Sequence, residues 1–165
     1  MSNMKYLVVI MLSVASLFGS SVGCNKDRSA IVGNTNIYNQ DSNNTDNTKG
    51  TKMKIKIGSN VFNATLFDNA TATAFKAMLP LTLEMDELNG NEKKHDFSKA
   101  LPTNSSNPKK INNGDLMLWG DKTLVLFYKT FPTSYSYTKL GRIDDSSGLE
   151  AAVGSESVTV TFQLD

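Results

Sequence analysis

Two residue types that commonly bind metals are almost missing from this sequence. The chain has one cysteine, Cys24, and one histidine, His95. A single cysteine excludes an intrachain disulfide and a cysteine-based zinc site, and a single histidine argues against a histidine-rich metal centre. No calcium-binding loop, glycine-rich phosphate loop, nucleophile elbow or catalytic-triad order is visible either. We therefore expect neither a metal nor a cofactor.

An excess of charge of either sign is also absent. The chain has 17 Lys and Arg residues against 16 Asp and Glu residues, for a net charge of +1. The two signs balance again when only residues 52–165 are counted. Nucleic-acid-binding domains concentrate basic residues on one face, so we expect no nucleic-acid partner.

No apolar run is long enough to cross a bilayer, which takes about 20 residues. The longest mainly apolar run covers residues 6–18 and follows the positive start Met4-Lys5. A short apolar run behind a basic residue is typical of a secretory signal peptide.

Residues 21–24, Ser-Val-Gly-Cys, resemble the lipobox of bacterial prolipoproteins, in which a small residue precedes a cysteine that becomes lipidated. Gly23 and Cys24 match this pattern, whereas Ser21 stands where an aliphatic residue is usual. The resemblance implies a signal peptide over residues 1–23 and an anchor on Cys24. The protein would then be held outside the cytoplasm, in a bacterial cell envelope. Its anchor would be stable, since two acyl chains suffice for stable anchoring. The alternative is an ordinary secretory signal with an incidental cysteine.

Residues 25–51 are rich in Asn, Thr, Ser, Asp and Gly. Four bulky apolar residues in this stretch bury too little surface to offset the entropy of ordering it. We therefore predict a disordered tether between Cys24 and a domain over residues 52–165. The alternative is that Ile31-Val32 or Ile37-Tyr38 docks on the domain as an edge strand.

From residue 52 onward, apolar and polar residues alternate, which predicts β-strands. The clearest are residues 52–57 and 61–66, joined by a turn at residues 58–60. Further strands are predicted at residues 81–86, 115–119, 123–129, 137–143 and 158–164. Helices are predicted from residue 68 or 69 to about 79 and over 147–153, with Asp144 and Asp145 at the start of the second. The polar residues 89–113 predict loops with a short extended piece at 97–101. About eight strands and two helices suit a closed barrel.

Three regions of the chain resemble a bacterial family of cyclophilin-like domains. They are residues 74–83 with 88–93, residues 101–104 with 114–120, and residues 124–131 with 134–143. The resemblance implies an eight-stranded β-barrel with two short capping helices. Isomerases of this fold use an arginine from a Phe-His-Arg run, and this chain has no such run. The family's catalytic residues therefore cannot be carried over to any position here.

Aromatic residues gather between positions 119 and 137, where they could line a groove. The alternative is core packing, which alternation along residues 124–128 favours for about half of the rings. The candidate ligand-binding residues are Trp119, Phe131, Tyr135, Tyr137 and the domain's sole arginine, Arg142. Arg142 has a simpler explanation as the partner of Asp144, and His95 as a solvated loop residue. No catalytic residue is assigned.

These observations favour a non-catalytic binding module, a monomer attached to a membrane by its lipid, whose ligand is a peptide or a small molecule. The main alternative is a divergent peptidyl-prolyl isomerase that uses Arg142 and the nearby aromatic loop. A third is an accessory domain of an extracytoplasmic redox or transport system. An open groove shared by Arg142 and the aromatics would favour the isomerase.

Overall fold

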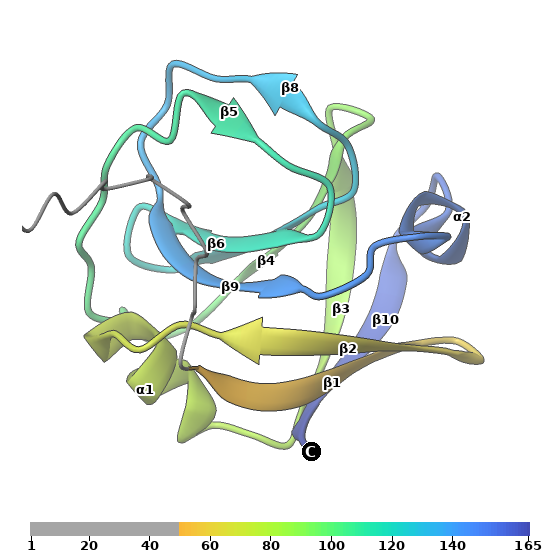
Figure 1. Cartoon of the computed structure of the whole chain (residues 1–165), viewed down its shortest axis with the longest axis horizontal. Coiled ribbons are helices and arrows are strands. Elements are labelled where there is room, and N and C mark those ends of the chain that lie inside the picture. The colour runs from red at the N-terminus through yellow and green to blue at the C-terminus, as the bar shows by residue number, and fades with distance from the viewer. Residues whose placement is uncertain (1–49) are drawn as a thin grey trace, which may run out of the picture. The chain divides into compact units, whose positions relative to one another are not determined.

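The computed structural model describes residues 50–165, and the predicted signal peptide, Cys24 and most of the predicted tether lie outside them. This part holds ten strands and two helices (Figure 1). The strands are β1 (Thr51–Ile57), β2 (Asn60–Leu66), β3 (Leu81–Leu88), β4 (Glu92–Asp96), β5 (Lys110–Ile111), β6 (Asp115–Trp119), β7 (Thr123–Phe127), β8 (Phe131–Pro132), β9 (Thr138–Ile143) and β10 (Val158–Leu164). The helices are α1 (Ala70–Lys76) and α2 (Leu149–Val153). No helix among residues 50–165 is long and apolar enough to cross a membrane.

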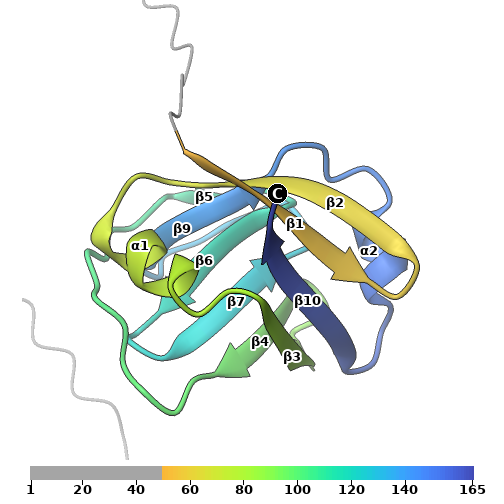
Figure 2. The same ribbon diagram turned by 90° about the horizontal axis from the view of Figure 1, so that it is seen from below.

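Eight strands close into an antiparallel barrel in the order β1-β10-β3-β4-β7-β6-β9-β2. The two helices lie on opposite sides of this barrel (Figures 1 and 2). Strands β5 and β8 form a separate two-stranded sheet outside it. The predicted fold class, a mainly β barrel of eight strands with two short helices, is confirmed.

Alternation along the strands fills the barrel. Met53, Ile55 and Ile57 of β1 are almost completely buried, while the lysines between them lie outside. Both helices add to this core: Phe75 of α1 meets Phe162 edge-on at a centroid distance of 5.5 Å, and Leu149 of α2 is fully buried. Burial of each such side chain contributes about 2 kcal/mol.

The ladder between β2 and β9 closes the barrel with only three residue pairs, Ala64–Leu66 opposite Gly141–Ile143. Gly141 is required there, because a Cβ atom at this position would lie 2.6 Å from the carbonyl oxygen of Thr65. Asp144 secures the same junction by accepting hydrogen bonds from Thr65 Oγ1 at 2.7 Å and Lys52 Nζ at 3.0 Å.

Both helices are shorter than predicted. Asn69 caps α1 by accepting a hydrogen bond from the backbone N–H of Ala72, as its side chain suggested, but the helix ends at Lys76 rather than near residue 79. Helix α2 begins at Leu149 behind Gly148, so Asp144 and Asp145 do not lie at its N-terminus. Asp145 instead accepts the N–H of Ser147, and Asp144 belongs to the barrel junction.

One barrel strand was missed in the sequence. Residues 92–96 form β4, which pairs with β3 and β7, inside the stretch predicted to be loops. The expected extended piece at 97–101 is not a strand. His95 therefore lies in a strand and not in a solvated loop, and its Nδ1 is 2.9 Å from the carbonyl oxygen of Glu84.

A second apolar cluster forms on the outer face of the barrel. It consists of Ile111, Met117, Val125, Phe127 and Tyr137, with Phe131 packed against it. Strands β5 and β8 supply Ile111 and Phe131, so this small sheet covers the outside of β6 and β7. Both faces of β7 are therefore buried. Leu124 and Leu126 belong to the core inside the barrel, and Val125 and Phe127 belong to this outer cluster.

Candidate functional site

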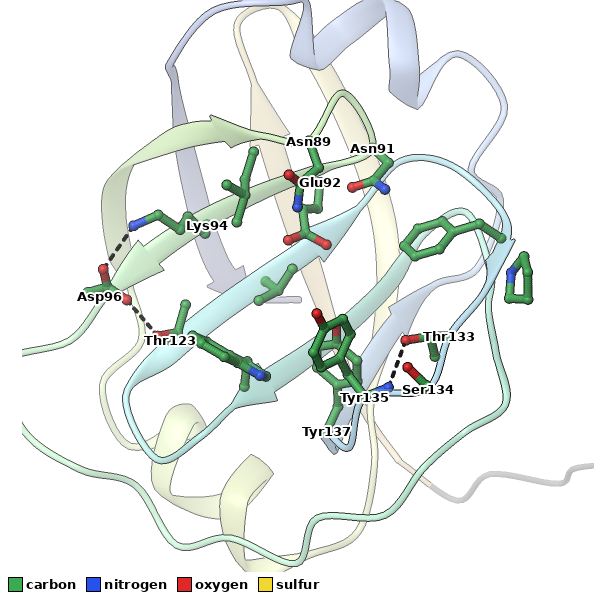
Figure 3. Close-up of a pocket in the computed structure, with 15 residues that line it drawn as sticks. Asn89, Asn91, Glu92, Lys94, Asp96, Thr123, Thr133, Ser134, Tyr135 and Tyr137 are labelled. Atoms are coloured by element: carbon green, nitrogen blue, oxygen red, sulfur yellow. Dashed lines mark hydrogen bonds and ion pairs between the residues drawn. The ribbon is translucent and has the colours of Figure 1, made fainter. Parts of the chain in front are cut away.

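A pocket of about 540 Å³ opens on the outer face of the barrel. Residues of β4, β6 and β7 and the segment from β8 to Tyr137 line it (Figure 3). Its volume lies in the usual range for small-molecule sites, about 300–1,000 Å³. The small sheet of β5 and β8 covers β6 and β7 but not β4, and the pocket lies beside β4.

The outer apolar cluster fixes the aromatic wall of this pocket. Phe127 makes edge-on contacts with Phe131 and Tyr137, at centroid distances of 5.8 and 5.4 Å. Tyr137 is only 7% exposed, so its ring is held in place by packing. A rigid aromatic wall loses little entropy when a ligand contacts it.

Three apolar side chains stand at the rim of the pocket. Trp119 is 53% exposed, Tyr135 64% and Leu88 37%, and all three line the opening. Large exposed apolar side chains grouped around a pocket are typical of binding sites. They extend the contact surface beyond the volume that a small molecule would fill.

Glu92 of β4 is the unusual polar residue of the pocket. Its side chain points into the pocket (Figure 3), yet the residue is only 8% exposed. Within residues 50–165 its carboxylate has no hydrogen-bond or ion-pair partner. Burial, with a smaller contribution from the negative charge of Glu87, raises the pKa of Glu92 to about 7. A carboxylate of this kind favours a ligand that supplies the missing hydrogen-bond donor or positive charge.

Asn91 places a second unpaired acceptor beside Glu92. Its Oδ1 atom is buried and accepts no hydrogen bond in the described part of the chain. Asn91 and Glu92 both line the pocket (Figure 3). A buried polar atom without a partner costs about 1–3 kcal/mol, and a bound ligand can offset that cost.

The other two charged residues of the pocket neutralise each other. Lys94 Nζ lies 2.9 Å from Asp96 Oδ2, and Thr123 donates a hydrogen bond to Asp96 Oδ1 at 2.6 Å. The Thr123 hydroxyl and then Lys94 hold the pKa of Asp96 below its usual value. Lys94 is therefore occupied and does not balance the charge of Glu92. In residues 50–165, no three His, Cys, Asp or Glu side chains are grouped closely enough to hold a metal.

The structure brings four of the five candidate site residues together. Trp119, Phe131, Tyr135 and Tyr137 all line the pocket. Arg142 does not line it: this exposed residue lies on β9 opposite Asp115 and Thr65. Asp144 is not its ion-pair partner either, because that carboxylate is held by Lys52 and Thr65.

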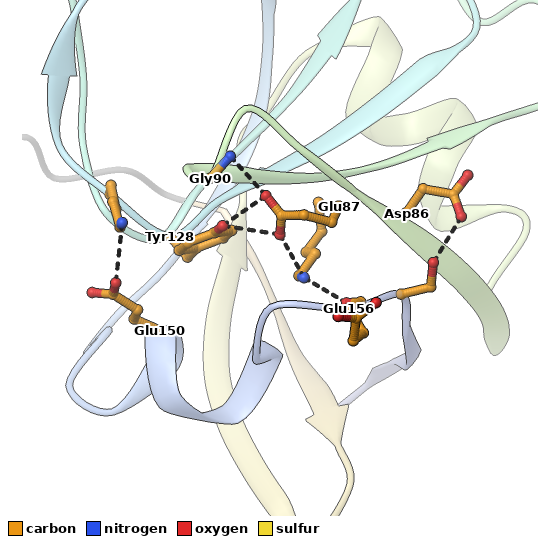
Figure 4. A network of polar contacts seen from close by, with 9 residues as sticks. Asp86, Glu87, Gly90, Tyr128, Glu150 and Glu156 are labelled. Carbon is orange, nitrogen blue, oxygen red and sulfur yellow. Dashed lines mark hydrogen bonds and ion pairs between the residues drawn. The ribbon is translucent and has the colours of Figure 1, made fainter.

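A separate polar network lies on the opposite face of β4 (Figure 4). Lys93 is completely buried, and its Nζ donates hydrogen bonds of 2.6 Å to Glu87 Oε2 and to the carbonyl oxygen of Glu156. Glu87 also accepts the Tyr128 hydroxyl at 2.9 Å and the N–H of Gly90 at 2.8 Å. All its charged members are paired, so the network has the character of a structural element.

The comparisons with known proteins agree with this architecture. The sequence model of the cyclophilin-like family matches residues 55–163. A solved structure of a hypothetical protein from Archaeoglobus fulgidus is similar in fold, with a TM-score of 0.53 and 19% sequence identity, over 70% of this chain and 95% of that one. A search of curated proteins found no match. The chain thus belongs to the cyclophilin-like family.

Proposed function

We propose that this protein is a lipid-anchored, extracytoplasmic binding module, and that its ligand is a peptide segment or a small molecule held in the outer pocket. The observation that carries the proposal is the pocket itself. It combines a fixed aromatic wall, an exposed apolar rim, and the buried, unpaired carboxylate of Glu92. Sites with few, well-placed polar groups in an apolar pocket are typical of ligand binding.

The alternative activity, prolyl isomerisation, finds less support. It requires groups that favour the twisted amide over the planar one. The isomerase hypothesis relies on Arg142 together with the aromatic loop, and Arg142 does not line the pocket that the loop residues line. No arginine is present among the described residues of the pocket wall.

The pocket can be tested with the chain's only tryptophan, because Trp119 lies at the opening. We expect members of a mixed library of short peptides and small molecules to change Trp119 fluorescence in a saturable way. The variant Ser134→Phe, which adds bulk to the pocket lining, should weaken that response at least about tenfold. Ser147→Phe, on an exposed loop outside this pocket, is the matched control.

Two results would contradict the binding proposal. One is a library without any saturable response in the wild-type protein. The other is a response that Ser134→Phe and Ser147→Phe reduce to the same extent, because the ligand would then bind elsewhere.

The anchor rests on the sequence alone, on the apolar run at residues 6–18 followed by Gly23-Cys24. We expect Cys24→Ser to move the protein from the membrane fraction to the soluble fraction, since the acyl chains supply the binding energy. Thr35→Ser, a conservative change in the predicted tether, should leave it in the membrane fraction. A wild-type protein that is fully soluble after removal of residues 1–23 would refute the anchor.

A further inference from the structure

Two residues of the outer pocket, Glu92 and Asn91, combine burial with hydrogen-bond acceptors that have no partner in the described part of the chain. Glu92 as a residue is only 8% exposed, and its carboxylate has no partner among residues 50–165; the neighbouring Asn91 Oδ1 is buried without a donor. The one cationic side chain that lines the pocket, Lys94, is held by Asp96. A ligand that fits these atoms therefore has to bring donors of its own.

The aromatic rings of the pocket favour the same class of ligand. Phe131, Tyr135 and Tyr137 line the pocket together with Glu92. The faces of such rings attract cations, and the attraction strengthens when the cation is removed from water. A pocket that holds a carboxylate and is also lined by aromatic rings offers a cation both charge and contact.

From this arrangement we infer that the pocket binds a primary alkylammonium group, with Glu92 as its counter-ion. The inference rests on the proposed binding function and names its ligand chemistry. An ammonium group has three donors and no acceptor, so it can pair with the Glu92 carboxylate and brings no unsatisfied acceptor of its own. The group can belong to a lysine side chain of a peptide or to a small free amine.

Binding should then depend on pH through Glu92. Its pKa of about 7 in the free protein means that the carboxyl is largely protonated at pH 6 and largely ionised at pH 8. The other titratable or charged groups around it keep their charge over this interval, because Glu87 and Asp96 have lowered pKa values and those of Lys94, Tyr128 and Tyr137 are raised. The affinity for an ammonium ligand should rise between pH 6 and pH 8.

The experiment uses the full chain and a matched pair of peptides, Ala-Lys-Ala and the same peptide with norleucine, which lacks the ammonium group. Both peptides carry blocked ends, and Trp119 fluorescence reports binding. At pH 8 we expect the lysine peptide to bind at least about tenfold more tightly than the norleucine peptide. Glu92→Gln should remove this preference and also the rise in affinity between pH 6 and pH 8.

Two controls isolate Glu92. Glu84→Gln removes an exposed carboxylate of β3 that does not line the pocket, and it should keep both the preference and the pH dependence. His95→Gln, on the opposite face of β4, is the second control and should also keep both. Pentylamine identifies the source of the ammonium: equal affinity for it indicates a free amine, and tighter binding of the lysine peptide indicates a peptide.

The inference fails if the lysine peptide does not bind, if both peptides bind equally well, or if Glu92→Gln leaves the preference intact. Equal binding of the two peptides would still support the proposed binding function, because the pocket would then select shape and apolar surface. The proposed function itself fails only when the broader library gives no saturable response, or a response that Ser134→Phe and Ser147→Phe reduce to the same extent.

Discussion

Glu92 and Lys93 are consecutive residues of β4, and both are buried, on opposite faces of the strand. Lys93 reaches a carboxylate and a backbone carbonyl oxygen, each at 2.6 Å. Glu92 has no such partner in the described part of the chain. A buried charge is costly unless it is paired. The Lys93 network meets this requirement within the protein, whereas Glu92 leaves it to be met by a ligand.

The largest expected effect comes from removing Lys93, the paired buried charge. Lys93→Met removes the cation and leaves Glu87 and the Glu156 carbonyl oxygen without it. We expect the free energy of unfolding, measured in urea, to fall by about 4 kcal/mol. Lys94→Met is the matched control, since its exposed ion pair with Asp96 contributes less than about 1 kcal/mol. Equal losses in the two variants would show that the buried network is not special.

The unpaired carboxyl of Glu92 should destabilise the protein in a pH-dependent way. The folded state keeps a proton on Glu92 up to about pH 7, while the unfolded state releases it near its ordinary pKa of 4.5. Between these values the folded state binds more protons, so raising the pH lowers the free energy of unfolding. Glu92→Gln removes this dependence.

We therefore expect wild-type stability to fall relative to Glu92→Gln by roughly 3 kcal/mol between pH 4.5 and pH 7, and to change little above that. Urea unfolding of both proteins at several pH values measures the difference. The carboxylates with lowered pKa values, such as Asp144, act in the opposite direction, but they are common to both proteins and cancel. A constant difference across this range would mean that Glu92 is ionised at low pH as well.

A smaller effect tests the hydrogen bonds within the paired network. Tyr128→Phe removes the hydroxyl that donates to Glu87. We expect a loss of about 1.5 kcal/mol in urea unfolding, the usual contribution of a hydrogen bond to a charged group. Tyr135→Phe, in an exposed side chain, should change stability by less than about 0.5 kcal/mol. A neutral Tyr128→Phe would show that Lys93 and the N–H of Gly90 satisfy Glu87 without the hydroxyl.

The smallest expected effect is on catalysis. We expect the protein to leave the isomerisation rate of a proline tetrapeptide at its uncatalysed value in a protease-coupled assay. A barrier of about 20 kcal/mol has to be lowered, and no arginine lines the described pocket. A rate above background that disappears in Arg142→Ala would restore the isomerase hypothesis.

The sequence predicted the barrel because most of its strands carry one apolar and one polar face. Strand β4 has no such alternation: its residues are Glu-Lys-Lys-His-Asp, and a polar run of this kind also predicts a loop. The strand tolerates this composition because Lys93 enters an ionic network and Glu92 faces the pocket. Such a strand is revealed only by contacts in the folded protein, because the local sequence pattern does not indicate it.

The same limit applies to the site. The aromatic cluster identified Trp119, Phe131, Tyr135 and Tyr137 correctly as neighbours, since they lie close together in sequence and in space. Arg142 is also close in sequence, but a register shift at Leu116 and Met117 and the course of β9 carry it away from the pocket. Glu92 and Asn91 were missed because they lie at the start of β4 and in the turn before it, distant in sequence from the aromatic cluster.

The short junction between β2 and β9 has a consequence for the misfolding of this protein. A closed barrel has no free strand edges, and free edges are the usual templates for intermolecular pairing. In this barrel three residue pairs join β2 to β9, and Gly141 and Asp144 stabilise that ladder. Opening this ladder would expose the edges of β2 and β9 while the other ladders stay paired. Concentration-dependent aggregation of Asp144→Ala, at temperatures where the wild type does not aggregate, would identify the junction as the protein's safeguard against polymerisation.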